Sequence, residues 1–319
     1  MRQGTATVVK HTGSHYLLSE LPAWDLFPAV VRGRIRLKES SNTNPIAVGD
    51  VVDYSVDEAA AGAEGADVMA TIDAIHPRRN YIIRRSTNLS REAHIIAANL
   101  DCVWLIVTMQ FPEVKLPFVD RFLVTCEAYG VPVNIVVNKR DIDDEYSMAL
   151  LKVFKEIYAD QAGYNVLEVS AITGENIDTV REACKGRINM FSGVSGVGKS
   201  SLIKAIDPKL EGIRVGEISL AHLQGKHTTT FYEMHPISTG GFIIDTPGIR
   251  SFGLIDFKKE ELSTYFPEML AVMDDCRFMP CTHTHEPGCA VKAAVEDGRI
   301  APERYNSYLG MLEEDQKFR

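Results

Sequence analysis

A chain of 319 residues is long enough to bury a sizeable core and to hold two or three domains. Its 45% apolar and 24% charged residues are ordinary for a globular protein, and the lack of an apolar leader or a membrane-length apolar run predicts a cytoplasmic protein with no membrane partner. A net charge of -9 excludes binding to nucleic acid by bulk electrostatic attraction, so an RNA contact needs a local basic patch.

Residues 1–75 have the pattern of a small all-β domain. Short β-rich runs, separated by Gly, Asn, Pro or Asp, cover residues 5–9, 16–18, 30–37, 50–56 and 68–75. About five strands in this length are typical of an OB-type barrel. The sequence therefore predicts an OB-type β-barrel at the N-terminus.

The third of these runs is strongly basic. Because side chains alternate along a strand, one face would carry Arg32, Arg34, Arg36 and Lys38. Such a stripe on this barrel is typical of RNA-backbone binding, although charges that only keep a strand face solvated explain it equally well. A second basic cluster lies downstream and favours an RNA partner; it consists of Arg78, Arg79, Arg84 and Arg85.

Strands and helices alternate from about residue 90, which predicts a parallel sheet with helices on its faces. Strand-like runs cover 100–107, 131–137 and 164–169, and helical spacing covers 118–129 and 148–158. Polar segments follow two of the strands at their carboxyl ends. They are Asn138, Lys139, Arg140 and Asp141 after the second strand, and Ser170 and Ala171 after the third.

These two segments have the chemistry of a guanine site. Guanine presents N1–H and N2–H₂ donors, and a single carboxylate such as Asp141 can accept from both. Adenine has an acceptor at N1 and no N2 amine, so it would leave that carboxylate unpaired. Asn138 suits the N7 and O6 side of the purine, and the Lys139 stem can pack over the ring. The Ser170–Ala171 segment would bring a backbone N–H to O6.

A phosphate-loop pattern, G-x-x-x-x-G-K-[ST], lies between a strand-like run at 188–191 and a helical run at 201–206. Its glycines let backbone N–H groups turn around a phosphate, and the helix dipole adds positive charge. Lys199 would reach the β- and γ-phosphates, and Ser200 would ligate Mg²⁺. A flexible surface turn is the simpler alternative. The residues expected at the nucleotide are Gly193, Val194, Ser195, Gly196, Val197, Gly198, Lys199, Ser200 and Ser201.

Two further segments complete a GTP-binding site. A strand at 241–244 leads into a D-x-x-G arrangement, in which Asp245 holds Mg²⁺ through water and the Gly248 N–H senses the γ-phosphate. The segment at 225–230 can supply a Mg²⁺-ligating threonine in a switch loop. Thr228 is the first choice and Thr229 the second, because adjacent threonines leave the register open.

Six cysteines in a reducing compartment favour core packing or metal binding over disulfides. Three of them, Cys102, Cys126 and Cys184, stand singly in apolar segments and are expected in the core. The mostly helical tail from about residue 258 contains Cys276, Cys281, His283 and Cys289. Three thiolates and an imidazole form a closed, structural Zn²⁺ shell. The spacing leaves His285 as a rival to His283, and free buried cysteines as the alternative to a metal site.

The order of the GTP-binding segments is unusual. In Ras-like GTPases the phosphate loop comes first, whereas here residues 138–141 and 170–171 precede it. The domain is therefore circularly permuted, which the same sheet allows because old termini lie near each other. This order, with the barrel, the cysteine cluster and the segments at 97–101 and 225–230, resembles the RsgA/YjeQ family of ribosome small-subunit-dependent GTPases over essentially the whole chain.

The resemblance implies a late assembly factor of the small ribosomal subunit that binds rRNA and hydrolyses GTP to GDP and phosphate. It also selects His283 as the fourth zinc ligand. Ile249 stands where Ras-like enzymes have a water-orienting Gln and cannot hydrogen-bond, so slow unassisted hydrolysis is expected. The resemblance implies that His227 approaches the attacking water when a partner reorders the switch loop; an incidental solvent-facing histidine is the alternative.

The sequence therefore predicts an α/β protein with an OB-type β-barrel at 1–75, a circularly permuted P-loop GTPase domain at 76–255 and a helical zinc-binding domain at 256–319. The expected cofactors are one structural Zn²⁺ and Mg²⁺ with GTP. A monomer is expected, with the small ribosomal subunit and its rRNA as partners. A P-loop ATPase or small-molecule kinase is a competing enzyme class, which Asp141 opposes. A nucleotide-regulated RNA-binding module with incidental hydrolysis is the alternative from another class.

Overall fold

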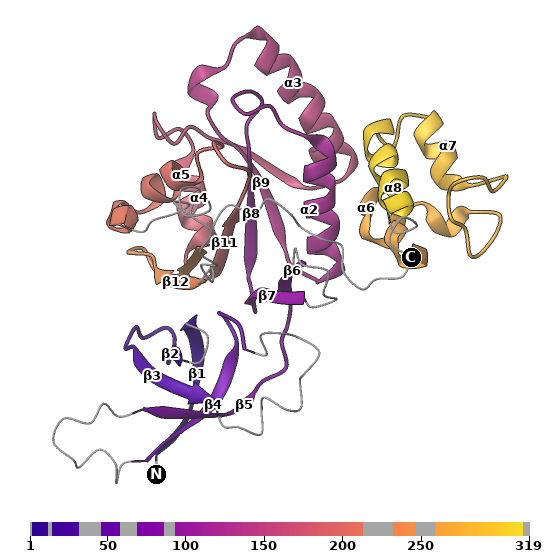
Figure 1. The fold of residues 1–319 in the computed structure, drawn as a ribbon. Helices are drawn as coiled ribbons and strands as arrows, with labels where there is room; N and C mark the ends of the chain where they lie inside the picture. The colour runs from indigo at the N-terminus through magenta and orange to yellow at the C-terminus, as the bar shows by residue number, and fades with distance from the viewer. Residues whose placement is uncertain are drawn as a thin grey trace, which may run out of the picture.

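An N-terminal barrel, a central α/β sheet and a group of C-terminal helices make up the chain (Figure 1). The computed structural model describes residues 2–11, 15–31, 46–57, 69–85, 93–212, 232–245 and 259–314. Its strands are β1 Arg2–His11, β2 His15–Ser19, β3 Phe27–Val31, β4 Val51–Val56, β5 Ala70–Ile75, β6 Tyr81–Arg85, β7 Ala93–Ala98, β8 Cys102–Val107, β9 Val133–Val137, β10 Asn165–Glu168, β11 Ile188–Ser192, β12 Glu233–Pro236 and β13 Phe242–Asp245. Its α-helices are α2 Leu116–Ala128, α3 Glu145–Lys155, α4 Ile177–Cys184, α5 Lys199–Ile206, α6 Pro267–Leu270, α7 Ala290–Glu296 and α8 Pro302–Glu314. Shorter 3-10 segments are Arg140–Ile142, Pro208–Gly212, Lys259–Tyr265 and Met273–Asp275, and α3 continues into a π-helical segment, Glu156–Gln161.

The first five strands close the barrel predicted from the sequence. Their order is β1-β2-β3-β5-β4, and β4 pairs again with β1, which joins the two edges of the sheet. Alternate side chains such as Val8 and Ile72 point inward and are buried. The expected basic stripe at 32–38 lies outside the described residues.

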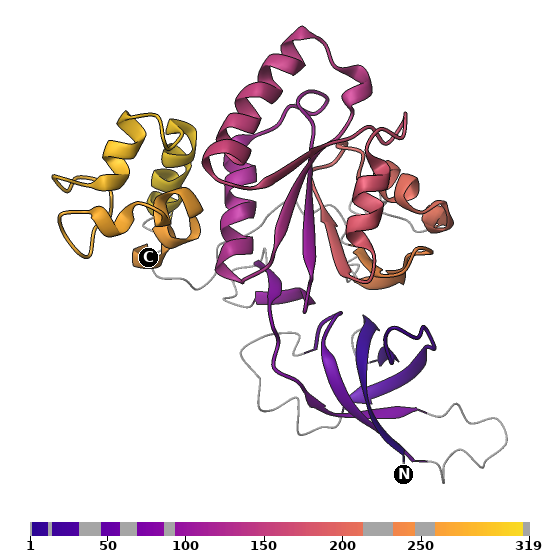
Figure 2. The same ribbon diagram turned by 180° about the vertical axis from the view of Figure 1, so that it is seen from behind.

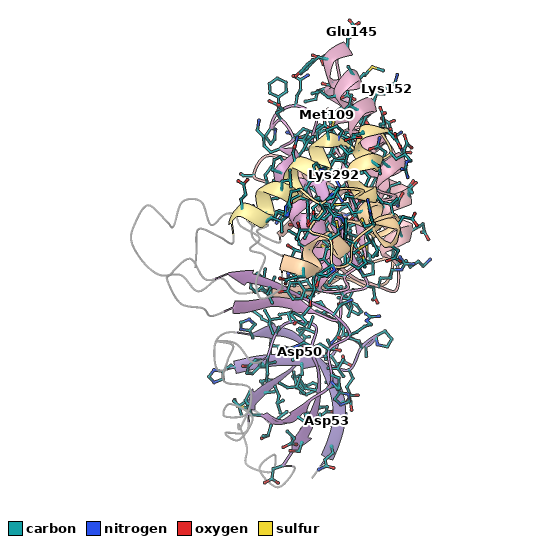
Figure 3. The ribbon with its side chains drawn as sticks, turned by 90° about the vertical axis from the view of Figure 1, so that its right-hand side faces the viewer. Asp50, Asp53, Met109, Glu145, Lys152 and Lys292 are labelled. Carbon is teal, nitrogen blue, oxygen red and sulfur yellow. The ribbon has the colours of Figure 1, made fainter. Side chains whose placement is uncertain are left out.

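Two arginines of the second basic cluster make contacts inside the protein. Arg78 donates to both carboxylate oxygens of the fully buried Asp50, each at 2.7 Å. Arg79 donates to the Asp101 carboxylate at 2.7 Å and to the Asn99 carbonyl at 2.9 Å. Figure 3 shows Asp50 on the part of the barrel that is nearer the central sheet. Arg78 and Arg79 therefore join the barrel to the sheet, a structural role that the sequence did not predict. Arg84 and Arg85 of the same cluster lie in β6, where the structure describes only their backbone.

The central sheet has the parallel order that alternating strands and helices predict. Strands β10, β9, β8, β11 and β13 are parallel neighbours in that order, and β12 pairs antiparallel with β13. Leu105 of β8 packs in the cluster with α2 and α3, whereas Trp104 packs on the other face with α4 and α5. β8 is wholly buried because helices cover both faces. The cysteines expected in the core are all buried: Cys102, Cys126 and Cys184.

The sheet also shows the permuted order of the chain. β8, β9 and β10 precede β11 in the sequence and lie on one side of it, while β12 and β13 follow it and lie on the other. The strand that leads into the phosphate loop is therefore central in the sheet and late in the domain. This arrangement confirms the predicted fold class of a circularly permuted α/β domain.

The barrel and the central sheet are continuous. β1 pairs antiparallel with β12, with Lys10 opposite Glu233, and the Lys10 ammonium lies 2.8 Å from the Glu233 carboxylate. Trp24 stacks on Phe242 of β13 with 5.4 Å between ring centroids. Eleven of the described strands thus form one sheet, and β6 and β7 pair in a separate two-stranded sheet. Seen from behind, the barrel lies directly below the lower ends of the central strands (Figure 2).

The C-terminal helices are joined to α2 by a buried ionic cluster. Arg304 of α8, 1% exposed, donates to both Glu268 oxygens at 2.6 and 3.1 Å and to Asp120 of α2 at 2.9 Å. Tyr158 also donates to Asp120, at 2.7 Å, and the guanidinium lies 4.7 Å from the Phe266 ring centroid. This cluster fixes the C-terminal helices on the central domain. None of the helices in the described ranges is long and apolar enough to cross a membrane.

Candidate nucleotide site and metal cluster

Three of the segments expected to bind a nucleotide lie at one edge of the central sheet. Residues 138–141 follow β9, residues 170–171 follow the end of β10, and residues 193–200 follow β11. Because these strands run parallel, their carboxyl ends share an edge. Segments far apart in the sequence therefore meet where sheets of this kind bind ligands.

The phosphate loop depends on glycine at several positions. Gly196 and Gly198 have φ of +90° and +89°, in the left-handed region that glycine adopts without strain. A Cβ at Gly193 would lie 2.6 Å from the Ile106 carbonyl oxygen, too close for any other residue. Val197 is 1% exposed and anchors the loop from inside.

The outer arc of the loop is open to solvent where a phosphate would enter. Val194, Ser195 and Gly196 are exposed, and Ser200 and Ser201 lie exposed in the first turn of α5. The first N–H groups of a helix have no acceptor within the helix itself, and the positive end of the dipole of α5 lies here. The loop and α5 thus form a concave set of donors suited to an anion.

Asn138 ties the phosphate loop to the base-recognition segments. Its Nδ2 donates to the Val197 carbonyl at 2.9 Å, and its Oδ1 accepts from the Ala171 N–H at 3.1 Å. A Cβ on Gly198 would lie 2.4 Å from Asn138 Nδ2, so the two segments are in direct contact. The sequence assigned Asn138 to the purine edge, and the structure shows that both ends of its amide group also hold the surrounding loops together.

Ser170 fixes the carboxylate expected to read the base. The buried Ser170 hydroxyl donates to Asp141 Oδ1 at 2.5 Å and accepts from the N–H groups of Ile172 and Thr173. Its rotamer is therefore set by several partners. Asp141 itself is exposed, so its carboxylate is oriented and accessible at the edge of the sheet.

Lys139 and Arg140 have different surroundings. Lys139 has a φ of +70° and its ammonium donates to the Phe111 carbonyl at 2.6 Å. Arg140 pairs with Asp143 and, at 3.1 Å, with Glu168, so its charge supports the loop around Asp141.

A segment that the sequence analysis missed also borders the site. Besides the Phe111 carbonyl, Pro112 lies beside the phosphate loop: a Cβ on Gly196 would be 3.5 Å from its Cδ. Phe111 is 70% exposed. No sequence motif marks these residues, because Phe111 contributes a backbone carbonyl and Pro112 contributes only a packing contact.

The switch residues are only partly described. Asp245 ends β13 and pairs with Phe191 of β11, which brings the D-x-x-G segment next to the strand of the phosphate loop. Its side chain is not described. The remaining expected switch residues lie outside the described ranges: His227, Thr228, Thr229, Gly248 and Ile249.

The four expected metal ligands converge in the C-terminal domain. The ligand atoms of Cys276, Cys281, His283 and Cys289 all lie within 4.8 Å of one another. Cys276 Sγ is 3.7 Å from His283 Nδ1 and 3.9 Å from Cys289 Sγ, and His283 Nδ1 is 3.4 Å from Cys289 Sγ. A tetrahedron with bonds of about 2.3 Å to sulfur and about 2.0 Å to nitrogen has edges of about 3.5 to 3.8 Å. The measured distances fit such a centre.

The surroundings of the cluster also suit a metal. Burial raises the pKa of the Cys281 thiol to about 12 and lowers the pKa of His283, so the imidazole is neutral and the thiol must lose its proton to bind. Glu286 accepts from the Thr282 N–H at 2.9 Å and shapes the loop around His283. His285 is exposed, is not a member of the cluster, and bonds to the Thr284 hydroxyl.

Comparison with known proteins gives a consistent result along the chain. The RsgA GTPase family model matches residues 75–255. A protein of Bacteroides fragilis named small ribosomal subunit biogenesis GTPase RsgA is 48% identical over 310 residues, which cover 97% of this chain and 96% of that protein. A protein of the same name from Flavobacterium johnsoniae is 45% identical over 98% of this chain and 94% of its own length.

Solved structures show the same architecture. YjeQ from Thermotoga maritima superimposes with a TM-score of 0.78 at 32% identity, covering 98% of both chains. YloQ, described as a circularly permuted GTPase, has a TM-score of 0.73 at 25% identity and covers 100% of this chain and 96% of its own.

Proposed function

This chain belongs to the RsgA GTPase family, and we propose that it hydrolyses GTP to GDP and phosphate in the assembly of the small ribosomal subunit. Its relatives bear that role in their names, and the match covers nearly the whole length of both proteins. The proposal is supported above all by the contacts of Asn138 with Val197 and Ala171, which join the segments expected to recognise the base to the phosphate loop.

In the proposed site each loop binds a different part of the nucleotide. Asp141 accepts from N1–H and N2–H₂ of guanine, the Ala171 N–H faces its O6 side, and the Lys139 stem covers the ring. Backbone N–H groups of 193–199 surround the β-phosphate, and Lys199 reaches the β- and γ-phosphates. Mg²⁺ bound with GTP would be held by the hydroxyls of Ser200 and Thr228, with Asp245 acting through water. The further residues proposed at the nucleotide are Arg140, Ser170, Ser201, Thr229 and Gly248.

Hydrolysis transfers the γ-phosphoryl group to water. The attacking oxygen forms a bond to the γ-phosphorus, the bond to the β–γ bridging oxygen breaks, and GDP leaves. Ile249 cannot orient the water, which favours slow turnover without a partner. In the proposed mechanism His227 supplies that function after the bound subunit has ordered the switch loop.

Purified small subunits are expected to raise GTP turnover on the order of 100-fold or more, which is the effect of a side chain positioned at the attacking water. His227→Ala is expected to lose most of this stimulation while its unassisted rate and GTP affinity stay unchanged. His285→Ala, an exposed histidine of the C-terminal domain, is the matched control and should behave as wild type. Phosphate release under steady-state conditions measures both effects. Subunits that bind without any acceleration would favour the alternative of a nucleotide-regulated RNA-binding module.

We further propose that the Cys276 cluster holds one structural Zn²⁺, because three thiolates and an imidazole leave no open position. Elemental analysis should find about one zinc ion per chain. Cys289→Ser is expected to lose it, whereas Cys126→Ala, a buried thiol outside the cluster, should keep it. Lowering the pH should release the metal, since protons compete for the thiolates and His283. Full retention in the Cys289 variant would refute the assignment.

The remaining partners follow from the same role. The basic stripe at 32–38 is the proposed rRNA contact of the barrel, because the chain as a whole is acidic and only a local patch can attract phosphates. A monomer working in the cytoplasm on the assembling subunit is the proposed state.

A further inference from the structure

The C-terminal domain has the wrong charge for an RNA-binding surface. Residues 259–314 contain eleven Asp and Glu residues against five Lys and Arg residues. One of those five, Arg304, is buried and paired with Asp120 and Glu268. Attraction to nucleic acid comes from Lys and Arg side chains that neutralise phosphates. The acidic excess instead favours a basic partner.

An exposed apolar loop projects from the same domain. The loop consists of residues 277–280 and is named here the knuckle loop. Phe278 is 46% exposed and Met279 is 64% exposed. Large apolar side chains that stand together in solvent mark interaction sites more often than single exposed ones do.

The knuckle loop is held firmly at its base. Its flanking residues, Cys276 and Cys281, both belong to the cysteine–histidine cluster. The Arg277 N–H donates to the Gly288 carbonyl at 3.0 Å, and the Arg277 guanidinium lies 5.5 Å from the Phe278 ring centroid. A rigid loop loses little conformational entropy when it binds, so its apolar side chains can contribute most of their burial to affinity.

We propose that the knuckle loop inserts Phe278 and Met279 into an apolar pocket on a basic protein of the small subunit; this inference rests on the proposed function. An aromatic ring with a neighbouring arginine can also stack on an unpaired RNA base. Asp274 and Asp275, both exposed and directly before Cys276, oppose that alternative because they would repel the nucleic-acid backbone. The same carboxylates attract a basic protein surface.

Neutralising Asp274 and Asp275 should change the affinity for small subunits in opposite directions for a basic protein partner and for an RNA partner. The double variant Asp274→Asn with Asp275→Asn should bind purified small subunits more weakly at low salt if the partner is a basic protein. It should bind more tightly if the partner is RNA, and that result would overturn the proposal. The double variant Phe278→Ala with Met279→Ala should weaken binding about tenfold or more. Val153→Ala, on the exposed face of α3, is the matched control for loss of an apolar side chain.

Photo-cross-linking identifies the partner directly. A benzoyl-phenylalanine probe at position 278, and a control probe at position 153, are irradiated with purified small subunits, and cross-linked RNA and protein are separated. A cross-link from position 278 to a basic ribosomal protein is expected. A cross-link to rRNA, or none from a chain whose GTP turnover the subunits still accelerate, overturns the proposal. Wild-type protein that neither binds subunits nor responds to them would refute the proposed function itself, and this inference with it.

Discussion

Replacing Arg304 with methionine is expected to lower the free energy of unfolding by about 3 to 5 kcal/mol, because it leaves two carboxylates buried without their partner. Asp120 is fully buried and Glu268 is 6% exposed, so water cannot replace the lost guanidinium. Methionine fills similar volume, which keeps the loss of packing small. Urea unfolding followed by circular dichroism and hydrogen exchange of α8 amides measure the effect.

Arg299→Met is the matched control for this change. Arg299 pairs with Asp297 at the surface, where both side chains are more than half exposed, and such pairs contribute little. Its substitution should change stability by about 0.5 kcal/mol or less. Equal effects of the two substitutions would show that the buried cluster does not hold the C-terminal helices.

The loss of unfolding free energy in Arg304→Met should also depend on pH. Burial already raises the pKa of Asp120, and Arg304 opposes that rise. Without Arg304 the folded-state pKa rises further above the unfolded value, so the folded variant takes up protons more readily than the unfolded chain. Its stability relative to wild type should therefore recover as pH falls from 8 toward about 5. A deficit that stays constant over this range would contradict the explanation.

Asp141→Asn is expected to weaken GTP binding about 100- to 1,000-fold and to improve binding of xanthosine triphosphate. The substitution removes the charge that accepts from guanine N1–H and N2–H₂, and each charge-assisted hydrogen bond contributes about 1.5 to 3 kcal/mol. Xanthine carries a carbonyl at C2, to which the new amide can donate, while its N1–H still finds an acceptor. Competition binding with a fluorescent GTP analogue measures both affinities.

Ser170→Ala provides the graded comparison. It keeps the Asp141 carboxylate and removes only the hydroxyl that orients it, so GTP affinity should fall about five- to tenfold with guanine preference retained. A variant Asp141→Asn that binds GTP as tightly as wild type would remove this residue from base recognition.

Patterns with a fixed chemistry were readable from the sequence. The phosphate loop and the tetrapeptide at 138–141 are spaced by what a nucleotide requires, so their placement at one sheet edge could be predicted. The single cysteines in apolar segments were correctly predicted in the core, and the Cys and His residues around His283 were correctly predicted to converge. Strand boundaries agreed to within a few residues, as for the predicted strand at 131–137 and the observed β9.

Contacts that join distant segments were not readable. Nothing near Lys10 indicates that it faces Glu233, because strand pairing between domains leaves no periodic pattern in either segment. The hairpin of β6 and β7 was missed because both strands lie between the predicted barrel, which ends at residue 75, and the first predicted strand of the central sheet, which starts at residue 100. The cluster that contains Arg78 and Arg79 favoured an RNA partner, and composition could not show that Arg78 pairs with the buried Asp50 or that Arg79 pairs with Asp101.

The pairing of β1 with β12 limits how this protein can be divided. A fragment that starts after β5 would leave β12 paired with β13 alone, so the outer edge of β12 would be open. An exposed edge strand presents unpaired backbone N–H and C=O groups, which can pair with a strand of another molecule. Cutting the chain at residue 76 is therefore expected to promote self-association through the open edge of β12, which the barrel covers in the intact chain.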